Sequence, residues 1–219
     1  MKKISDKYTI YGRKKGRKKI NIVEKDFFVN CRINLETDIK KNKMNIIDVG
    51  SGRGENTLFL AKKNPDALII ATEIFWDGNI NLCKQLSKLR LYNVKIFSNN
   101  VLKLFDNLNK DDYFNEIWIL FPDPWPKKKH YKRRLINDNF FTKVYPYLKK
   151  NGKIFIATDS SSYLKSIMNS IYKTKSLFNW LNNKPQNWIY DMLDLPYTKF
   201  FKKAQNSYRP SFFIELEKI

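Results

Sequence analysis

Apolar runs of strand length alternate with segments of helical periodicity between residues 44 and 173. The five apolar runs, which we expect to be buried strands, cover residues 44–50, 67–73, 93–100, 115–124 and 153–159. The remaining pattern predicts a short helical segment after residue 100 and longer helices at 55–64, 77–91, 134–150 and 161–173. Pro65 and Gly152 end the first and third of these longer helices. This alternation predicts an α/β fold with a mostly parallel sheet and helices on both faces.

The two flanks of this pattern are less regular. Residues 1–43 are basic and interrupted by Gly12 and Gly16, which indicates a partly disordered N-terminal arm on a domain that covers residues 44–219. Beyond residue 173 the pattern weakens, although residues 211–219 favour a last strand, antiparallel at the sheet edge. A chain of 219 residues fits one such domain.

A polar residue closes each of the five predicted strands. These residues are Asp48, Glu73, Asn99 with Asn100, Asp123 and Asp159. Turn formation alone would explain any one of them. Ligands of open parallel sheets bind outside the carboxyl ends of the strands, so five polar ends on one edge predict a binding site there.

The turn after the first strand reads "DVGSGRGE" and places Gly50, Gly52 and Gly54 before a helix. It lacks the Lys-Ser/Thr pair of a phosphate-binding loop and the spacing of a dinucleotide fingerprint, and Glu55 would repel a pyrophosphate. A nucleoside with a cationic end, such as S-adenosylmethionine, suits the loop better. Glu73 ends the next strand, where its carboxylate can accept both ribose hydroxyls.

The charge of the chain is strongly positive, with 42 basic and 21 acidic residues. Such a charge favours nucleic acid as a partner, because neutralised phosphates release their counterions. Lysine dominates the basic residues, as AT-rich codons would also produce, so clustering carries more weight than net charge. The two clusters lie at residues 11–20 and 127–134, and a merely solvated face remains the alternative for the first.

Cysteine and histidine are too few for a metal centre or a disulfide framework. Cys31, Cys83 and His130 are the complete set, so we expect no transition metal. The chain shows no apolar run of transmembrane length and no signal-peptide core, so we expect a cytoplasmic protein without membrane association. The sequence leaves the oligomeric state open.

The stretch "FPDPWPKKKHYKRR" holds a carboxylate in a proline-restricted segment just before the second basic cluster. Three prolines limit the backbone around Asp123, and a structural turn is the alternative reading. We expect the basic residues to position a polyanion while Asp123 meets the reacting base. Trp125 is suited either to stacking on a base or to burial.

In their order along the chain, these features resemble the bacterial tRNA (guanine-N7-)-methyltransferases. The resemblance rests on "DVGSGRGE", Glu73, "FPDPWPKKKHYKRRL", "ATD" at Asp159 and "TKF" at residues 198–200, and "YGRKKGRK" is similar to the family's basic arm. It implies a Rossmann-like class I methyltransferase fold with a seven-stranded sheet and S-adenosylmethionine as cofactor. The implied substrate is tRNA, at guanosine 46 of its variable loop.

The resemblance also implies roles for individual residues. Cofactor contacts fall on Asp48, Gly50, Gly52, Glu73, Asn100 and Asp123, and the last is also the catalytic candidate. Substrate contacts fall on Lys127, Asp159, Thr198, Lys199, Phe200 and Phe201, and RNA contacts on Lys129, His130, Tyr131, Lys132, Arg133 and Arg134. The family commonly has Glu, Asp and Glu where this chain has Asp48, Asn100 and Phe201.

The chemistry expected at this edge needs no general base, because guanine N7 carries a lone pair and no proton. Asp123 and Asp159 are expected to orient guanine through its N1–H and amino groups and to stabilise the developing positive charge. Two alternatives stay open: methylation of another nucleic-acid position, and an RNA-binding protein whose cofactor site has decayed. An amino-directed enzyme would carry an N/D-P-P-Y/F motif, which "DPWP" does not match.

Overall fold

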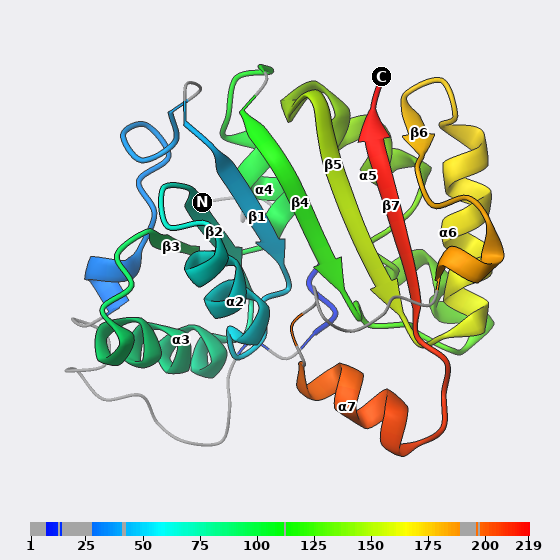
Figure 1. The fold of residues 1–219 in the computed structure, drawn as a ribbon, viewed down its shortest axis with the longest axis horizontal. Helices are drawn as coiled ribbons and strands as arrows, with labels where there is room; N and C mark the ends of the chain where they lie inside the picture. Colours follow the sequence, from blue (N-terminus) through cyan, green and yellow to red (C-terminus); the bar gives the residue numbers. More distant parts are fainter. Residues whose placement is uncertain are drawn as a thin grey trace, which may run out of the picture.

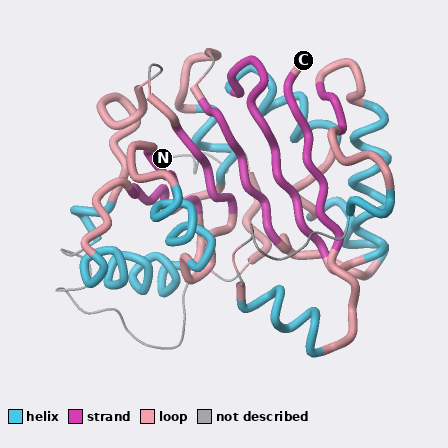
Figure 2. The backbone as a smooth tube through the Cα atoms, in the orientation of Figure 1, coloured by secondary structure: helices cyan, strands magenta, loops and turns pink. Residues whose placement is uncertain are grey.

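The computed structural model describes residues 8–12, 14, 28–40, 43–111, 113–188, 196 and 198–219. Seven strands of this part form one sheet in the order β3-β2-β1-β4-β5-β7-β6 (Figure 1), and they lie side by side (Figure 2). The strands are β1 (Asn45–Val49), β2 (Leu68–Thr72), β3 (Val94–Phe97), β4 (Phe114–Leu120), β5 (Leu148–Thr158), β6 (Phe178–Trp180) and β7 (Phe212–Lys218). β1 to β5 pair in parallel, whereas β7 runs antiparallel to both β5 and β6.

The helices cover both faces of the sheet (Figure 1). They are α2 (Glu55–Lys63), α3 (Trp76–Leu89), α4 (Val101–Asp106), α5 (Asp138–Val144), α6 (Ser161–Lys173) and α7 (Lys199–Asn206). Among the described residues, three 3-10 helices accompany them: η1 (Lys128–Arg133), η2 (Tyr145–Tyr147) and η3 (Pro185–Trp188). The alternation of side chains along a strand sends Ile46 to the core under α2 and α3, and Ile47 to the core under α4, α5 and α6.

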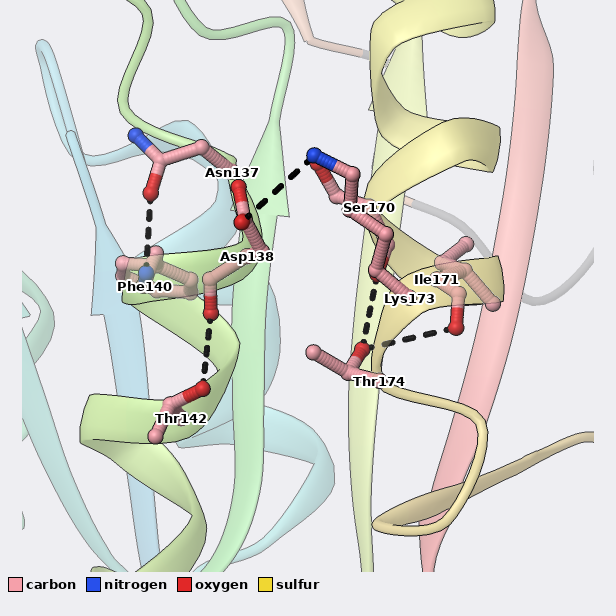
Figure 3. Close-up of polar contacts among 8 residues, drawn as sticks. All are labelled: Asn137, Asp138, Phe140, Thr142, Ser170, Ile171, Lys173 and Thr174. Carbon is pink, nitrogen blue, oxygen red and sulfur yellow. Dashed lines mark hydrogen bonds and ion pairs between the residues drawn. The ribbon is translucent and has the colours of Figure 1, made fainter.

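The predicted helix at residues 134–150 is wrong, because this segment contains three different elements. The Asn137 side chain accepts a hydrogen bond from Phe140 N–H and starts α5 only at Asp138 (Figure 3). Pro146 lies in η2, where the α-helix has already ended. Lys173 forms an ion pair of 3.7 Å with Asp138 and joins α6 to the start of α5 (Figure 3).

Gly152 does not end a helix but lies inside β5, which begins at Leu148. A Cβ at this glycine would come within 2.8 Å of both Leu148 and the Lys149 carbonyl oxygen. The neighbouring Asn151 has a left-handed backbone, with φ of 59°. The register of β4 against β5 shifts between Phe114 and Glu116. β5 therefore continues through an irregularity, and the sequence of this segment was mistaken for the end of a helix.

The last strand is antiparallel as predicted, but it does not lie at the sheet edge. β7 pairs with β5 on one side and with β6 on the other, so β6 forms the edge. β6 has three residues, too few for a periodic pattern, and it is held by the buried ring of Phe178. That is why the sequence did not reveal it.

Part of the predicted N-terminal arm packs against the domain. Phe28, Ile33 and Ile39 are buried, and Arg32 forms a parallel bridge with Ile96 of β3. The domain boundary at residue 43 stays a prediction, and most of the first basic cluster lies outside the described residues. Every helix in the described part of the chain is too short or too polar to span a bilayer.

Candidate active site

A cavity of about 360 Å³ lies at the carboxyl edge of the sheet, where the sequence predicts a ligand. The glycine loop, the start of α2 and the start of α7 enclose it. Its lining residues are Asp48, Gly50, Ser51, Gly52, Arg53, Glu55, Asn56, Phe75, Leu120, Thr198, Lys199, Phe200 and Lys203. A second cavity of similar volume lies on the face of β4, β5 and β7, but it contains none of the predicted site residues. The first cavity is therefore the candidate site.

Asp48 is buried and supports the cavity through two side chains of α2. Its Oδ1 accepts a hydrogen bond of 2.8 Å from Asn56 Nδ2, and its Oδ2 accepts one of 2.5 Å from Thr57 Oγ1. Burial raises the pKa of Asp48 to about 6, against the opposing effect of these two hydrogen bonds. Asp48 thus fixes the start of α2 and places a carboxyl group of raised pKa at the cavity wall.

Glu73 holds the glycine loop in place. Its Oε1 accepts hydrogen bonds from the N–H groups of Ile74 and Phe75, and its Oε2 accepts one of 2.8 Å from Gly52 N–H. A carboxylate has about four acceptor positions, so these three bonds leave capacity for a ligand hydroxyl. The predicted ribose contact of Glu73 stays a prediction, but the carboxylate lies beside the loop as that role requires.

The shape of the glycine loop depends on its own glycines and on one glycine of α3. Gly50, Gly52 and Gly54 have φ of 69°, 57° and 90°, a region in which side chains with a Cβ are strained. Gly78 of α3 approaches the loop so closely that a Cβ there would lie 2.1 Å from the Gly52 carbonyl oxygen. The loop is therefore shaped by its own backbone and by the packing of α3.

Asn100 lies just after β3 and caps α4. Its Oδ1 accepts a hydrogen bond of 2.9 Å from Leu102 N–H. Beside it, Asn79 of α3 donates to the Glu73 carbonyl oxygen and to Ser98 Oγ. Asn100 does not line the cavity as described, so its cofactor contact stays a prediction.

The loop that carries Asp123 has an unusual backbone. Phe121 and Trp125, on either side, have φ of 52° and 43°, and each precedes a proline. Phe121 N–H donates to the Ala157 carbonyl oxygen at 2.8 Å, and its ring packs against Phe201. Asp123 itself is exposed, three residues after Leu120 of the cavity wall. Asp123 is not among the residues that line the cavity, so its cofactor contact and its catalytic role stay predictions.

The second basic cluster forms η1, directly after this loop. Lys127, Lys129, Tyr131 and Lys132 are exposed, as an RNA contact requires. His130 lies edge-on to the Trp125 ring at 5.9 Å between centroids. The guanidinium of Arg133 lies over two rings, at 4.9 Å from that of Tyr11 and 5.0 Å from that of Trp125. One described residue of the N-terminal segment therefore packs onto the basic cluster.

Arg134 differs from the rest of its cluster, because it is 4% exposed and bonded within the protein. Its position favours a structural role over the RNA contact predicted for it.

α7 brings the predicted "TKF" residues to the cavity in part. Thr198 Oγ1 accepts a hydrogen bond from Phe201 N–H and starts the helix, and Lys199 N–H donates to Glu55 Oε2 of α2. Lys199 and Phe200 line the cavity, whereas Phe201 is buried against Ala157 and Phe213. The side chain of Phe201 thus belongs to the core instead of the predicted substrate surface.

Asp159 directly follows β5 and pairs with Arg209, which the sequence gave no reason to expect. Arg209 donates from Nε at 2.9 Å and from Nη2 at 2.7 Å, both to Oδ2 of the carboxylate. Asn56, Thr57, Phe75 and Lys203 were also missed. A polar pair in the first turn of α2 signals the first two, but the others reach the site only through tertiary structure.

Within the described residues, His, Cys, Asp and Glu side chains form no group suited to a metal ion. The site instead combines backbone N–H groups, carboxyl groups and an exposed basic helix. Such a site can hold a nucleoside ligand with a cationic end beside a polyanion.

Comparison with known proteins agrees with this description. The model of the family described as "Methyltransf_4: Putative methyltransferase" matches residues 42–214. A protein of Neisseria meningitidis FAM18 named tRNA (guanine-N(7)-)-methyltransferase is 32% identical over 145 residues, which is 66% of this chain and 61% of that protein. One of Wolbachia pipientis wMel with the same name is 33% identical over 156 residues, or 71% and 70% of the two chains. The chain thus spans about three fifths of the length of the Neisseria relative.

Solved structures share the fold at low identity. An rRNA methylase from Streptococcus thermophilus has a TM-score of 0.54 at 15% identity and covers 96% of this chain and 99% of its own. A Streptococcus mutans protein described as "a putative methyltransferase", solved with S-adenosylhomocysteine, has a TM-score of 0.53 at 14% identity and covers 92% of this chain and 100% of its own. These likenesses confirm the predicted class I methyltransferase fold. The family match over residues 42–214 shows that this chain belongs to the Methyltransf_4 family of methyltransferases.

Proposed function

We propose that this protein transfers a methyl group from S-adenosylmethionine to N7 of a guanine in tRNA, at guanosine 46 of the variable loop. The observation that carries the proposal is the position of Asp123. Along the chain, its strained loop follows Leu120 of the cavity wall and precedes the exposed basic helix η1. The names of the Neisseria and Wolbachia relatives support the same activity. An enzyme that methylates tRNA would be located in the cytoplasm.

The residues at the cavity fit S-adenosylmethionine. When bound, this cofactor supplies a methyl group on a positively charged sulfur. Asp48, Glu55 and Glu73 surround the glycine loop and would attract cationic groups, whereas a phosphate chain would be repelled. Phe75 offers an apolar surface in the cavity, and Gly52 brings backbone groups close to the ligand space.

Asp123 and Asp159 would orient the guanine. Because N7 carries no proton, these carboxylates need only accept hydrogen bonds from the base and stabilise positive charge on it. Arg209 takes Oδ2 of Asp159, so among the described residues Oδ1 is left for a guanine N–H. The exposed lysines of η1 would contact tRNA phosphates and hold the guanosine in register.

The proposal is tested by incubating the protein with methyl-labelled S-adenosylmethionine and unmodified tRNA, then identifying the labelled nucleosides. We expect 7-methylguanosine from the variable loop. Label in a different nucleoside would show another target position. Binding of tRNA without label would indicate an RNA-binding protein with a decayed site.

Asp123→Asn tests the assigned role of the carboxylate. Turnover should fall about 100-fold or more, as for other lost transition-state contacts, while affinity for S-adenosylhomocysteine changes little. Asp66→Asn is the matched control, because Asp66 is exposed at the opposite edge of the sheet, before β2. Equal turnover of the two variants would refute the role of Asp123.

A further inference from the structure

We propose that Arg134 is a positioning residue that fixes the loops of Asp123 and Asp159 relative to each other. This inference rests on the proposed function, since it gives the two carboxylates their shared task. It assigns to a member of the basic cluster a role inside the protein instead of at the RNA surface.

The guanidinium of Arg134 joins two segments that are distant in the sequence. Its Nε donates to the Pro124 carbonyl oxygen at 2.9 Å. Its Nη1 donates to the Ser162 carbonyl oxygen at 3.0 Å and to Ser166 Oγ at 2.6 Å, and its Nη2 donates to Ser162 Oγ at 2.9 Å. Four of the five N–H donors of the side chain are thus directed at fixed acceptors.

Two of these acceptor residues are close in sequence to the two carboxylates. Pro124 directly follows Asp123, and Ser162 lies three residues after Asp159 in the first turn of α6. A planar guanidinium with rigid donors therefore sets the separation of the two loops. A lysine could satisfy one or two of these acceptors but could not reproduce the arrangement.

The loop of Asp123 requires such an anchor because its backbone is strained. Phe121 and Trp125 have positive φ values, and such residues persist only where surrounding structure holds them. The loop is fixed to β5 at its start, by the hydrogen bond from Phe121 N–H to the Ala157 carbonyl oxygen. Arg134 supplies the second attachment, at Pro124.

The surroundings of Arg134 are those of a structural charge. Its guanidinium lies 3.7 Å from the centre of the Tyr131 ring and 4.9 Å from that of Tyr163. Burial raises the pKa of Tyr163. The positive charge of Arg134 lowers this pKa and the negative charge of Asp123 raises it, so both charges lie close enough to interact with the Tyr163 hydroxyl. A side chain that is 4% exposed would have to leave all four hydrogen bonds to reach a phosphate.

Arg134→Lys tests the proposal, with Lys165→Ala as a matched control. Lys165 is exposed on α6 between Ser162 and Ser166, so its loss removes one positive charge without touching the hydrogen bonds of Arg134. A displacement of about 1 Å at a reacting group costs on the order of 100-fold in rate, so kcat of Arg134→Lys should fall about 100-fold. Affinity for S-adenosylhomocysteine should stay within about threefold, because its other candidate contacts, such as Asp48, Gly52 and Glu73, lie on elements that Arg134 does not touch.

Salt dependence separates positioning from RNA contact. Loss of a phosphate contact lowers the slope of log affinity for tRNA against log salt by about 1. We expect Arg134→Lys and Arg134→Ala to keep the wild-type slope. A slope lowered by about 1 in Arg134→Ala, or a kcat of Arg134→Lys equal to that of Lys165→Ala, would overturn the proposal.

A double-mutant cycle tests the specific partner. Ser166→Ala should lower kcat less than Arg134→Lys does. The double variant should be no slower than Arg134→Lys alone, because both changes remove hydrogen bonds of the same guanidinium. If the double variant instead loses kcat by the product of the two single losses, Arg134 and Ser166 have no shared role.

Hydrogen exchange gives a readout that needs no methyl transfer. The backbone amides of Phe121, Asp123, Trp125 and Lys127, between which the prolines lie, should exchange faster in Arg134→Lys than in the wild type and Lys165→Ala. If the wild type methylates no nucleoside, the proposed function fails. Faster exchange in Arg134→Lys would then still support the positioning role of Arg134. Unchanged exchange in Arg134→Lys would overturn the positioning role of Arg134.

Discussion

Replacing Asp48 with asparagine should stabilise the protein at neutral pH. Burial raises the pKa of Asp48 from 3.8 to about 6. The folded protein therefore binds the proton more tightly than the unfolded chain, and stability falls as the pH rises from about 4 to about 6. Above pH 6 the carboxylate is charged and buried, which costs about 3 kcal/mol for a shift of about two pKa units. At pH 4.5 the same relation leaves a cost of about 1 kcal/mol.

Asparagine can keep the local hydrogen bonds without this charge. Its Oδ1 would accept from Asn56 Nδ2 as Asp48 does, and its Nδ2 would donate to Thr57 Oγ1, because a hydroxyl can also accept. The free energy of unfolding of Asp48→Asn should exceed that of the wild type by about 3 kcal/mol at pH 7.5 and by about 1 kcal/mol at pH 4.5. At pH 7.5 the melting temperature should rise by about 6–12 °C.

Urea unfolding followed by tryptophan fluorescence at the two pH values measures this difference. Asp66→Asn is the control, because it removes an exposed carboxylate and should show no comparable gain. A variant less stable than the wild type at pH 7.5, or one with the same gain at both pH values, would refute the reasoning. Affinity for S-adenosylmethionine should fall in Asp48→Asn, since the cavity loses a negative charge, so stability and function should move in opposite directions.

Three further changes test other parts of the site. Gly78→Ala should displace the Gly52 carbonyl, because its Cβ would lie 2.1 Å from that oxygen, and should weaken S-adenosylhomocysteine binding at least 10-fold in calorimetry. Phe201→Ala should lower the free energy of unfolding by about 3–5 kcal/mol, as a buried ring does, and a value below about 1 kcal/mol would place its ring outside the core. Lys129→Ala with Lys132→Ala should lower the salt slope of tRNA binding by about 2, and an unchanged slope would mark these lysines as merely solvated.

The positions of Asp48 and the glycine loop could be predicted because their determinants are local. Asp48 lies eight and nine residues from its partners Asn56 and Thr57, and the glycines that bend the chain stand between them. Strand alternation fixes which side chains reach the carboxyl edge. Short-range pattern therefore sufficed to place Asp48, Glu73 and the loop at the carboxyl edge, while their contacts with a cofactor stay predictions.

The errors arose where distant residues decide the outcome. Composition cannot distinguish Arg134 from its basic neighbours, because its burial depends on Ser162 and Ser166, which lie 28 and 32 residues away. Phe201 was placed at the substrate by its motif, but Ala157 and Phe213 draw it into the core. The irregular start of β5 likewise depends on its pairing with β4 and not on local propensity.

The prolines around Asp123 do not by themselves account for the geometry of its loop. A residue before proline prefers an extended backbone, yet Phe121 and Trp125 both precede prolines and both have positive φ. Local sequence thus opposes the observed conformation, and tertiary contacts must impose it. The Ala157 carbonyl holds the start of the loop, Arg134 holds Pro124, and Arg133 packs on the Trp125 ring. Because these contacts come from β5 and from the end of η1, the placement of Asp123 depends on the assembled domain. Removing Arg134 should therefore let the loop relax toward its local preference even where the prolines are intact.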